Sequence, residues 1–212
     1  MEAGGGYKNK DLIGIPWMLA LALRDDGWYL RQDIIWHKPN PMPESVRDRC
    51  TKAHEYIFLL SKKPQYYFDH DAMLEEADPK NASRYDYAFN SGKQQESFRP
   101  NGAVNTYGMK NYDGMRNKRD VWTVSFKPFS GAHFATFPEA LSEPCILAGS
   151  RKGDVVLDPF NGAATTGVVC MKNDRDYIGI ELNPEYVELS KNRLAQTDAE
   201  IYMAKNQFNL FE

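Results

Sequence analysis

The sequence predicts an α/β protein with a mainly parallel β-sheet. Strands and helices alternate in its last third: an apolar strand at 154–158, a glycine-containing turn, a helix over 163–173, a strand at 177–181 and a helix over 184–195. Strands that alternate with helices form parallel sheets with right-handed crossovers. The length of 212 residues and the hydrophobic content of 42% suit one globular domain with an insertion.

The first 70 residues contain a predicted helix and three predicted strands. Residues 12–23 combine apolar residues with helix formers, and Pro16 suits the first turn of that helix. Residues 28–36 (WYLRQDIIW) and the apolar run 55–61 (EYIFLLS) are predicted strands, separated by a loop that begins with a proline-rich stretch. The turn that follows the second run favours a hairpin, with residues 65–69 as the next strand.

Residues 71–120 differ in composition from the rest of the chain. They contain few aliphatic residues and many Asn, Gly, Tyr and Arg residues. Such a long irregular stretch inside a compact protein is more often functional than a filler. We therefore expect an N-terminal part of the sheet (1–70), an insertion (71–120) and a C-terminal βαβα part (121–212). The last part begins with a helix over 138–148, in which Pro144 marks a kink or break.

Composition excludes several classes of protein. The 26 Lys and Arg residues are matched by 29 Asp and Glu residues, so the chain is no histone-like polycation. No apolar run reaches the roughly 18 residues that span a membrane, and the N-terminal residues lack a signal-peptide core. Three Cys residues, without metal-ligand spacing to the four His residues, argue against disulfides and against a metal site. A reducing cytoplasm is the expected location.

The charges are unevenly distributed along the chain. Residues 129–212 have a local charge of −5, whereas residues 84–128 have +4 and residues 36–63 have +3. Basic segments interleaved with Tyr, Trp, Asn and Gln are compatible with phosphate contacts and base stacking. The alternative on charge alone is an ordinary solvated surface of mixed sign.

The sharpest motif is the turn after the strand at 154–158. Asp158 ends that strand, Gly162 permits a tight turn close to a ligand, and Glu181 ends the next strand, 23 positions after Asp158. An acid at that place can accept hydrogen bonds from both ribose hydroxyls. The loop has no Lys, which excludes a P-loop, and its glycines fit a dinucleotide site poorly. The acid before the turn favours a cationic nucleoside such as S-adenosylmethionine; the alternative is an ordinary βαβ turn capped by the two acids.

Several motifs resemble those of amino-directed DNA methyltransferases, which modify adenine N6 or cytosine N4. Residues 158–167 (DPFNGAATTG) resemble the cofactor loop D-P-F-x-G-S-G-T-T of that family. The other similar segments are 181–186 (ELNPEY, ribose binding), 133–141 (HFATFPEAL, methionine end of the cofactor), and 33–43 (DIIWHKPNPMP) with 54–61 (HEYIFLLS), the strand–loop–strand region. The resemblance covers most of the chain, in the motif order called the beta arrangement.

The resemblance implies a Rossmann-like methyltransferase sheet that binds S-adenosylmethionine and methylates double-stranded DNA, as in restriction–modification systems. It assigns target recognition to residues 71–120. The cofactor-binding residues that it implies are Phe137, Pro138, Asp158, Phe160, Asn161, Gly162, Thr165, Thr166, Glu181 and Asn183. The basic residues expected to contact DNA are Arg84, Arg99, Lys110, Arg116, Lys118 and Arg119. On the side of the target base it points to Trp36, His37, Lys38 and Asn40. The alternatives are a core residue at a strand end for Trp36 and a solvated surface cation for Lys38.

Two features depart from the family pattern. Ala164 replaces the second glycine of the cofactor loop, and we expect at most weaker cofactor binding from its methyl group. The catalytic tetrapeptide, Asp, Asn or Ser followed by Pro-Pro and an aromatic residue, is absent because the chain contains no Pro-Pro pair. The sheet is therefore expected to be incomplete at its N-terminus. Residues 40–43 (NPMP) contain an amide and prolines but no adjacent aromatic residue, so they replace the tetrapeptide poorly.

Three hypotheses follow from the missing tetrapeptide. The chain is a methyltransferase whose recorded start is too late or whose tetrapeptide another polypeptide supplies, as in a split enzyme. Alternatively, it binds cofactor or DNA without transferring a methyl group, or it is a degraded fragment with an exposed sheet edge.

Overall fold

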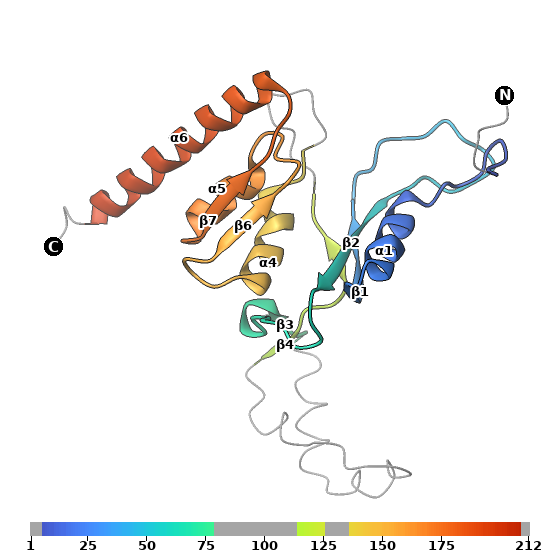
Figure 1. Ribbon diagram of the computed structural model, residues 1–212, viewed down its shortest axis with the longest axis horizontal. Coiled ribbons are helices and arrows are strands. Elements are labelled where there is room, and N and C mark those ends of the chain that lie inside the picture. Colours follow the sequence, from blue (N-terminus) through green and yellow to red (C-terminus); the bar gives the residue numbers. More distant parts are fainter. Residues whose placement is uncertain (1–5, 79–113, 126–135, 209–212) are drawn as a thin grey trace, which may run out of the picture. The chain divides into compact units, whose positions relative to one another are not determined.

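The computed structural model describes residues 6–78, 114–125 and 136–208 (Figure 1). The chain divides into two compact units, one formed by Asp69–Arg119 and the other by the remaining residues. Three of the expected DNA contacts, Arg84, Arg99 and Lys110, lie outside the described residues, as do residues 133–135.

The larger unit begins with a helix and a small mixed sheet. Helix α1 (Ile15–Asp25) is followed by strand β1 (Tyr29–His37) and strand β2 (His54–Ser61), which pair antiparallel. Strand β5 (Val121–Thr123) adds in parallel to the other edge of β1, so that the order is β2–β1–β5. The α/β fold class is confirmed, but this part of the sheet is mixed rather than mainly parallel.

The predicted hairpin between β2 and residues 65–69 is wrong. Residues 65–69 form no strand, and the antiparallel partner of β2 is β1. The loop between β1 and β2 contains no helix. Two neighbouring parallel strands must be joined by a crossover connection, which usually contains a helix. The β1–β2 loop has no such helix, so β2 runs antiparallel to β1.

Helix α1 packs on this sheet through Trp17. The Trp17 ring meets Tyr56 and Phe58 of β2 edge-on, at centroid distances of 5.6 and 5.0 Å. Pro16 lies in the first turn, as predicted. The helix begins later than predicted because Gly14 adopts a left-handed conformation with φ 74° and interrupts the helical backbone before Ile15.

The smaller unit contains a short antiparallel ladder. A 3₁₀ turn, η1 (Asp71–Met73), leads into β3 (Leu74–Glu76), which pairs with β4 (Met115–Asn117). The backbone N–H of Ala77 also donates to Gly114 O at 2.8 Å. The ladder thus joins the two ends of the predicted insertion.

The C-terminal part of the larger unit has the predicted strand–helix–strand–helix order. Its elements are α4 (Glu139–Gly149), β6 (Val155–Asp158), α5 (Thr165–Lys172), β7 (Asp176–Gly179) and α6 (Pro184–Phe208). Strands β6 and β7 pair in parallel, with Asp158 opposite Gly179. Helix α4 continues through Pro144, which is therefore not a break.

Helices α4 and α5 cover one face of the β6–β7 pair. Ile146, Val169 and Cys170 form a buried cluster, and Val156 and Tyr177 of the two strands pack against it. Strand side chains alternate between faces, so this packing fixes which face of the pair is buried.

The opposite face of the β6–β7 pair is apolar and exposed. Val155, Leu157 and Ile178 are 59%, 57% and 54% exposed. Parallel strands in proteins are normally covered on both faces, so among the residues that the structure describes these three form an uncovered apolar face. None of the helices described is long and apolar enough to cross a membrane.

Candidate functional site

Asp158 organises the turn at the carboxyl end of β6. Its Oδ1 atom accepts the backbone N–H of Phe160 at 3.0 Å, and its Oδ2 atom accepts the hydroxyl of Thr166 at 2.6 Å. One carboxylate therefore holds both the start of the turn and the first turn of α5. Of the predicted cofactor residues, Asp158, Phe160 and Thr166 are thus brought together by direct contacts.

Glu181 closes the turn from the end of the neighbouring strand. Its Oε2 atom accepts the backbone N–H of Gly162 at 2.8 Å, and its Oε1 atom accepts that of Asn183 at 2.9 Å. The hydrogen bond from Asn183, and to a lesser extent that from Gly162, lowers the pKa of Glu181 and keeps it ionised. A carboxylate has about four acceptor positions, so Glu181 retains capacity for the hydroxyls of a ligand.

Two residues of the turn have left-handed backbone conformations. Gly162 has φ 49°, and a Cβ atom there would meet no atom closer than 4.0 Å, so glycine is needed for conformation rather than for space. Ala164 has φ 58° and is fully buried. Since this conformation is unfavourable for an alanine, the structure explains why glycine is the expected residue at this position of the loop.

Phe160 and Asn161 point to different surroundings. Phe160 is 89% exposed, so its ring is available to a ligand. The Asn161 side chain is buried, and its Oδ1 atom accepts the hydroxyl of Tyr177. Burial, and then the charge of Asp158, raises the pKa of Tyr177 to about 12, so this hydroxyl remains a donor. Asn161 therefore stabilises the turn through its buried hydrogen bond with Tyr177.

The other predicted cofactor residues are placed as follows. Asn183 accepts the N–H of Glu185 at 3.0 Å through its side chain and so caps α6. Phe137 is part-exposed, and Pro138 is the N-cap residue of α4. Thr165 is buried, and its hydroxyl faces Arg193 of α6.

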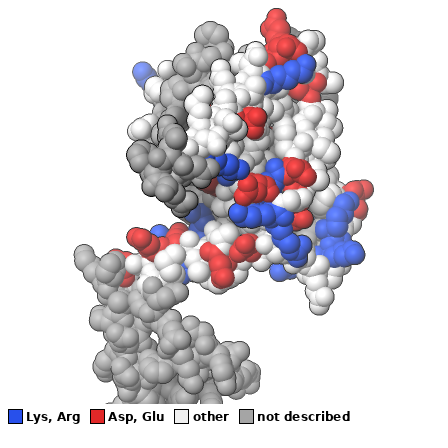
Figure 2. All heavy atoms as spheres, turned by 90° about the vertical axis from the view of Figure 1, so that its left-hand side faces the viewer, with Lys and Arg blue, Asp and Glu red and all other residues white. Residues whose placement is uncertain are grey.

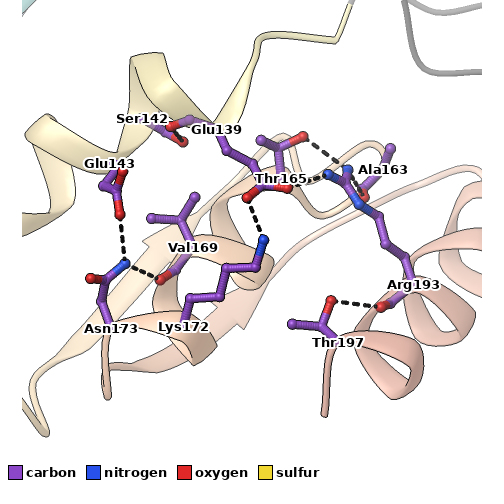
Figure 3. A network of polar contacts seen from close by, with 10 residues as sticks. All are labelled: Glu139, Ser142, Glu143, Ala163, Thr165, Val169, Lys172, Asn173, Arg193 and Thr197. Atoms are coloured by element: carbon purple, nitrogen blue, oxygen red, sulfur yellow. Dashed lines mark hydrogen bonds and ion pairs between the residues drawn. The ribbon is translucent and has the colours of Figure 1, made fainter. Parts of the chain in front are cut away.

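Arg193 and Glu139 were not predicted from the sequence. Arg193 donates to the Ala163 carbonyl at 2.9 Å and to the Thr165 hydroxyl at 3.1 Å, and it lies 3.4 Å from the Glu139 carboxylate (Figure 3). Glu139 also pairs with Lys172 at 2.7 Å. The only sequence signal was the position of Glu139 directly after Phe137 and Pro138.

The predicted target-base side is centred on the end of β1. Trp36 is 4% exposed, and its Nε1–H donates to Val124 O at 2.9 Å, so this ring belongs to the core. Lys38 lies over that ring, 4.4 Å from its centroid, and forms an ion pair with Glu55. Next to them, His37 Nδ1 contacts the Thr123 hydroxyl at 3.1 Å. Asn40 is exposed.

Two predicted DNA contacts in the smaller unit share one carboxylate. The Nε–H groups of Arg116 and Arg119 both donate to Glu75 at 2.9 Å. Partial burial alone would raise the pKa of Glu75, but Arg119 and Arg116 outweigh it and lower the pKa. Lys118 is held through its backbone, which donates to Met73 O at 2.8 Å.

The surface charges of the larger unit are mixed. Figure 2 shows acidic and basic side chains interspersed on the face that it presents. In the C-terminal part, Lys152 pairs with Asp174 at 2.9 Å and Lys191 pairs with Glu188 at 2.7 Å. Within the described part of the chain, no three His, Cys, Asp or Glu residues are grouped as metal ligands.

The fold and the site define an α/β protein whose candidate ligand site lies at the carboxyl ends of adjacent parallel strands, where two carboxylates hold one turn. The chain belongs to the DNA methylase family, whose model matches residues 3–192. The predicted resemblance is thereby confirmed.

Two curated relatives illustrate the match. The chain is 52% identical over 196 residues to the Type II methyltransferase M.Cfr9I of Citrobacter freundii, which covers 92% of this chain and 54% of that protein. It is 50% identical over 190 residues to the Type II methyltransferase M.SmaI of Serratia marcescens, which covers 89% and 54%. The chain therefore spans about half the length of these relatives.

Solved structures share the fold. A crystal structure of an M1.HpyAVI–SAM complex matches with a TM-score of 0.57 and 25% identity, over 87% of this chain and 71% of that chain. The cytosine-N4-specific PvuII DNA methyltransferase matches with a TM-score of 0.58 and 21% identity, over 85% and 58%. The Rossmann-like methyltransferase architecture is thus supported for this chain.

Proposed function

We propose that this chain is part of a DNA amino-methyltransferase that transfers a methyl group from S-adenosylmethionine to adenine N6 or cytosine N4 in double-stranded DNA. The observation that carries the proposal is the double carboxylate turn, in which Asp158 and Glu181 hold Gly162 and its neighbours at the ends of β6 and β7. Membership of the DNA methylase family supports the same reaction class.

The residues of the turn fit this cofactor by the chemistry of their donors and acceptors. S-adenosylmethionine has ribose hydroxyls, which suit the remaining acceptor positions of Glu181, and it is positively charged, which suits a site with two carboxylates. The exposed Phe160 ring offers an apolar surface. The bound cofactor would supply an activated methyl group on sulfur, and Phe137 with Pro138 would cover its methionine end.

On the DNA side, the chain has to hold a base outside the helix. The exocyclic amine is a poor nucleophile, so alignment with the methyl donor supplies much of the rate. We assign His37, Lys38 and Asn40 to the target-base side, because they lie at or just after the end of β1 and are at least partly accessible. Trp36 is left out of this set because it is buried.

Calorimetry with S-adenosylmethionine tests the cofactor site. Asp158→Ala and Glu181→Ala should each weaken affinity about 10- to 100-fold, since a hydrogen bond to a charged group contributes about 1.5–3 kcal/mol. Glu188→Ala, which removes an exposed carboxylate of α6, is the matched control and should bind normally. Unchanged affinity in both turn variants would overturn the assignment.

Arg116, Lys118 and Arg119 are proposed phosphate contacts. Each such contact contributes close to one unit to the slope of log affinity against log salt, so Arg119→Gln should lower that slope by about 1. Arg24→Gln on α1 removes an exposed arginine outside the proposed interface and serves as the control. An unchanged slope in Arg119→Gln would remove this residue from the interface.

We propose that a segment outside residues 1–212, either an upstream part of the same polypeptide or a second polypeptide, supplies the Pro-Pro-aromatic tetrapeptide. The observation that favours it is the uncovered apolar face formed by Val155, Leu157 and Ile178. Tritium methyl transfer to mixed-sequence DNA should be absent for the chain alone and should appear when a polypeptide with that tetrapeptide is co-expressed. Cofactor binding without transfer in both cases would instead support a non-catalytic binding module.

A further inference from the structure

Arg193 bonds the residues on both sides of a strained backbone position. It reaches from α6 to the Ala163 carbonyl at 2.9 Å and to the Thr165 hydroxyl at 3.1 Å (Figure 3). Ala164, which lies between these two residues in the chain, has φ 58°. A non-glycine residue keeps this conformation only where its surroundings enforce it. The Arg193 side chain is 15% exposed, so these bonds are sheltered from water.

Glu139 holds the guanidinium in place. One oxygen of Glu139 faces Arg193 at 3.4 Å, and the other pairs with Lys172 of α5 at 2.7 Å. Glu139 is the first residue of α4 and directly follows Phe137 and Pro138. Arg193 is therefore connected both to the cofactor turn and to the segment proposed to cover the cofactor.

We propose that Arg193, oriented by Glu139, is a positioning residue that keeps Ala164 in its left-handed conformation and thereby sets the affinity of the turn for the nucleoside cofactor. The inference rests on the proposed function for its ligand. The guanidinium of Arg193 is planar and carries several N–H donors in fixed directions. Two of these donors reach the Ala163 carbonyl and the Thr165 hydroxyl at once, while a third faces the Glu139 carboxylate. A lysine has no such geometry.

The first test is cofactor affinity measured by calorimetry with S-adenosylmethionine. Arg193→Gln should bind at least tenfold more weakly, and Arg193→Lys should recover only part of the loss. Lys191→Gln is the control, because Lys191 lies on the same helix, is exposed and pairs with Glu188. This variant should bind S-adenosylmethionine like the unmodified chain. Equal affinity of Arg193→Gln and the unmodified chain would overturn the proposal.

A double variant separates positioning from simple packing of α6 on α5. Glycine adopts the left-handed conformation without enforcement, so Ala164→Gly should restore most of the affinity that Arg193→Gln loses. If Arg193 only docked α6, the glycine would restore nothing. If Ala164→Gly restores no affinity, the positioning role of Arg193 is rejected, whereas the proposal that the turn binds the cofactor still stands.

Hydrogen exchange without ligand tests the turn independently of the cofactor. The amide of Gly162 donates to Glu181, and that of Ala164 donates to Asn161 O at 2.9 Å. Both should exchange at least tenfold faster in Arg193→Gln, while the Asp26 amide at the end of α1 stays unchanged. If the unmodified chain binds no cofactor, the proposed function and this affinity effect both fail; unchanged exchange rejects the positioning role alone.

Discussion

Glu181 and Ala164 determine the shape of the turn after β6. Glu181 joins Gly162 to Asn183 through two hydrogen bonds, and Ala164 occupies a backbone region that alanine disfavours. Glu181 thus stabilises the turn through hydrogen bonds to its carboxylate, whereas the left-handed backbone of Ala164 strains the turn. These opposed contributions can be measured by substitution.

The strain at Ala164 predicts a difference between two glycine variants. Ala163 and Ala164 are both buried, but only Ala164 has a positive φ. Either change to glycine removes a buried methyl group and raises the conformational entropy of the unfolded chain, and both effects lower stability. Only Ala164→Gly also relieves about 1–2 kcal/mol of backbone strain. Urea unfolding should therefore find Ala164→Gly more stable than Ala163→Gly by about 1 kcal/mol. Equal stabilities would show that Ala164 is not strained.

The carboxylate of Glu181 predicts a pH dependence. The pKa of this group is lowered in the folded chain from 4.5, so its stabilising contribution is complete above pH 4.5 and is lost as the pH falls through the folded pKa. The difference in free energy of unfolding between the unmodified chain and Glu181→Gln should therefore shrink from pH 7 to pH 3. A difference that grows in acid would contradict the assigned shift.

At the scale of secondary structure, elements with a local signal were predictable and those set by pairing were not. The strands and helices around Asp158 and Glu181 follow from apolar periodicity and the glycine turn. The partner of β2 did not, because residues 65–69 resemble a strand locally but β1 supplies the antiparallel neighbour. Pro144 likewise predicts a kink or a break, but α4 continues through it without a break.

Helix α1 offers a test of packing at this scale. Trp17→Ala removes the edge contacts to Tyr56 and Phe58 and should lower the free energy of unfolding by about 2 kcal/mol, less than a fully buried aromatic residue would cost. Leu19→Ala, at a more exposed position of the same helix, should cost less than about 1 kcal/mol. Thermal or urea unfolding compares the two, and equal losses would place Trp17 outside the core.

At the scale of the whole molecule, the two-stranded β6–β7 sheet is covered on only one face within the described part of the chain. The chain spans 54% of the length of M.Cfr9I and of M.SmaI, and Val155, Leu157 and Ile178 form an uncovered apolar face. Exposed apolar faces and sheet edges favour association. The exposed face is the physical reason for proposing that a further segment, of the same or of another polypeptide, covers it.

Lysine substitutions test the uncovered face. Leu157→Lys should change the stability of the chain by no more than about 0.5 kcal/mol and reduce self-association, because residue 157 is exposed. The same change should block activation by the co-expressed polypeptide. Val156→Lys, on the covered face, should destabilise the fold instead. Analytical ultracentrifugation and methyl transfer provide the readouts, and activation that survives Leu157→Lys would exclude this face as the contact.

The sequence alone determined the fold class, the strand–turn–helix order of the cofactor part and the two carboxylates at its centre, because neighbouring residues in regular spacing carry that information. Tertiary structure decided which groups support the turn. Arg193 contacts Ala163 and Thr165, which lie 30 and 28 residues earlier in the chain. Strand β2 pairs with β1, which precedes it, and not with residues 65–69, which follow it. Contacts over such separations depend on how helices and strands pack, so no local spacing encodes them.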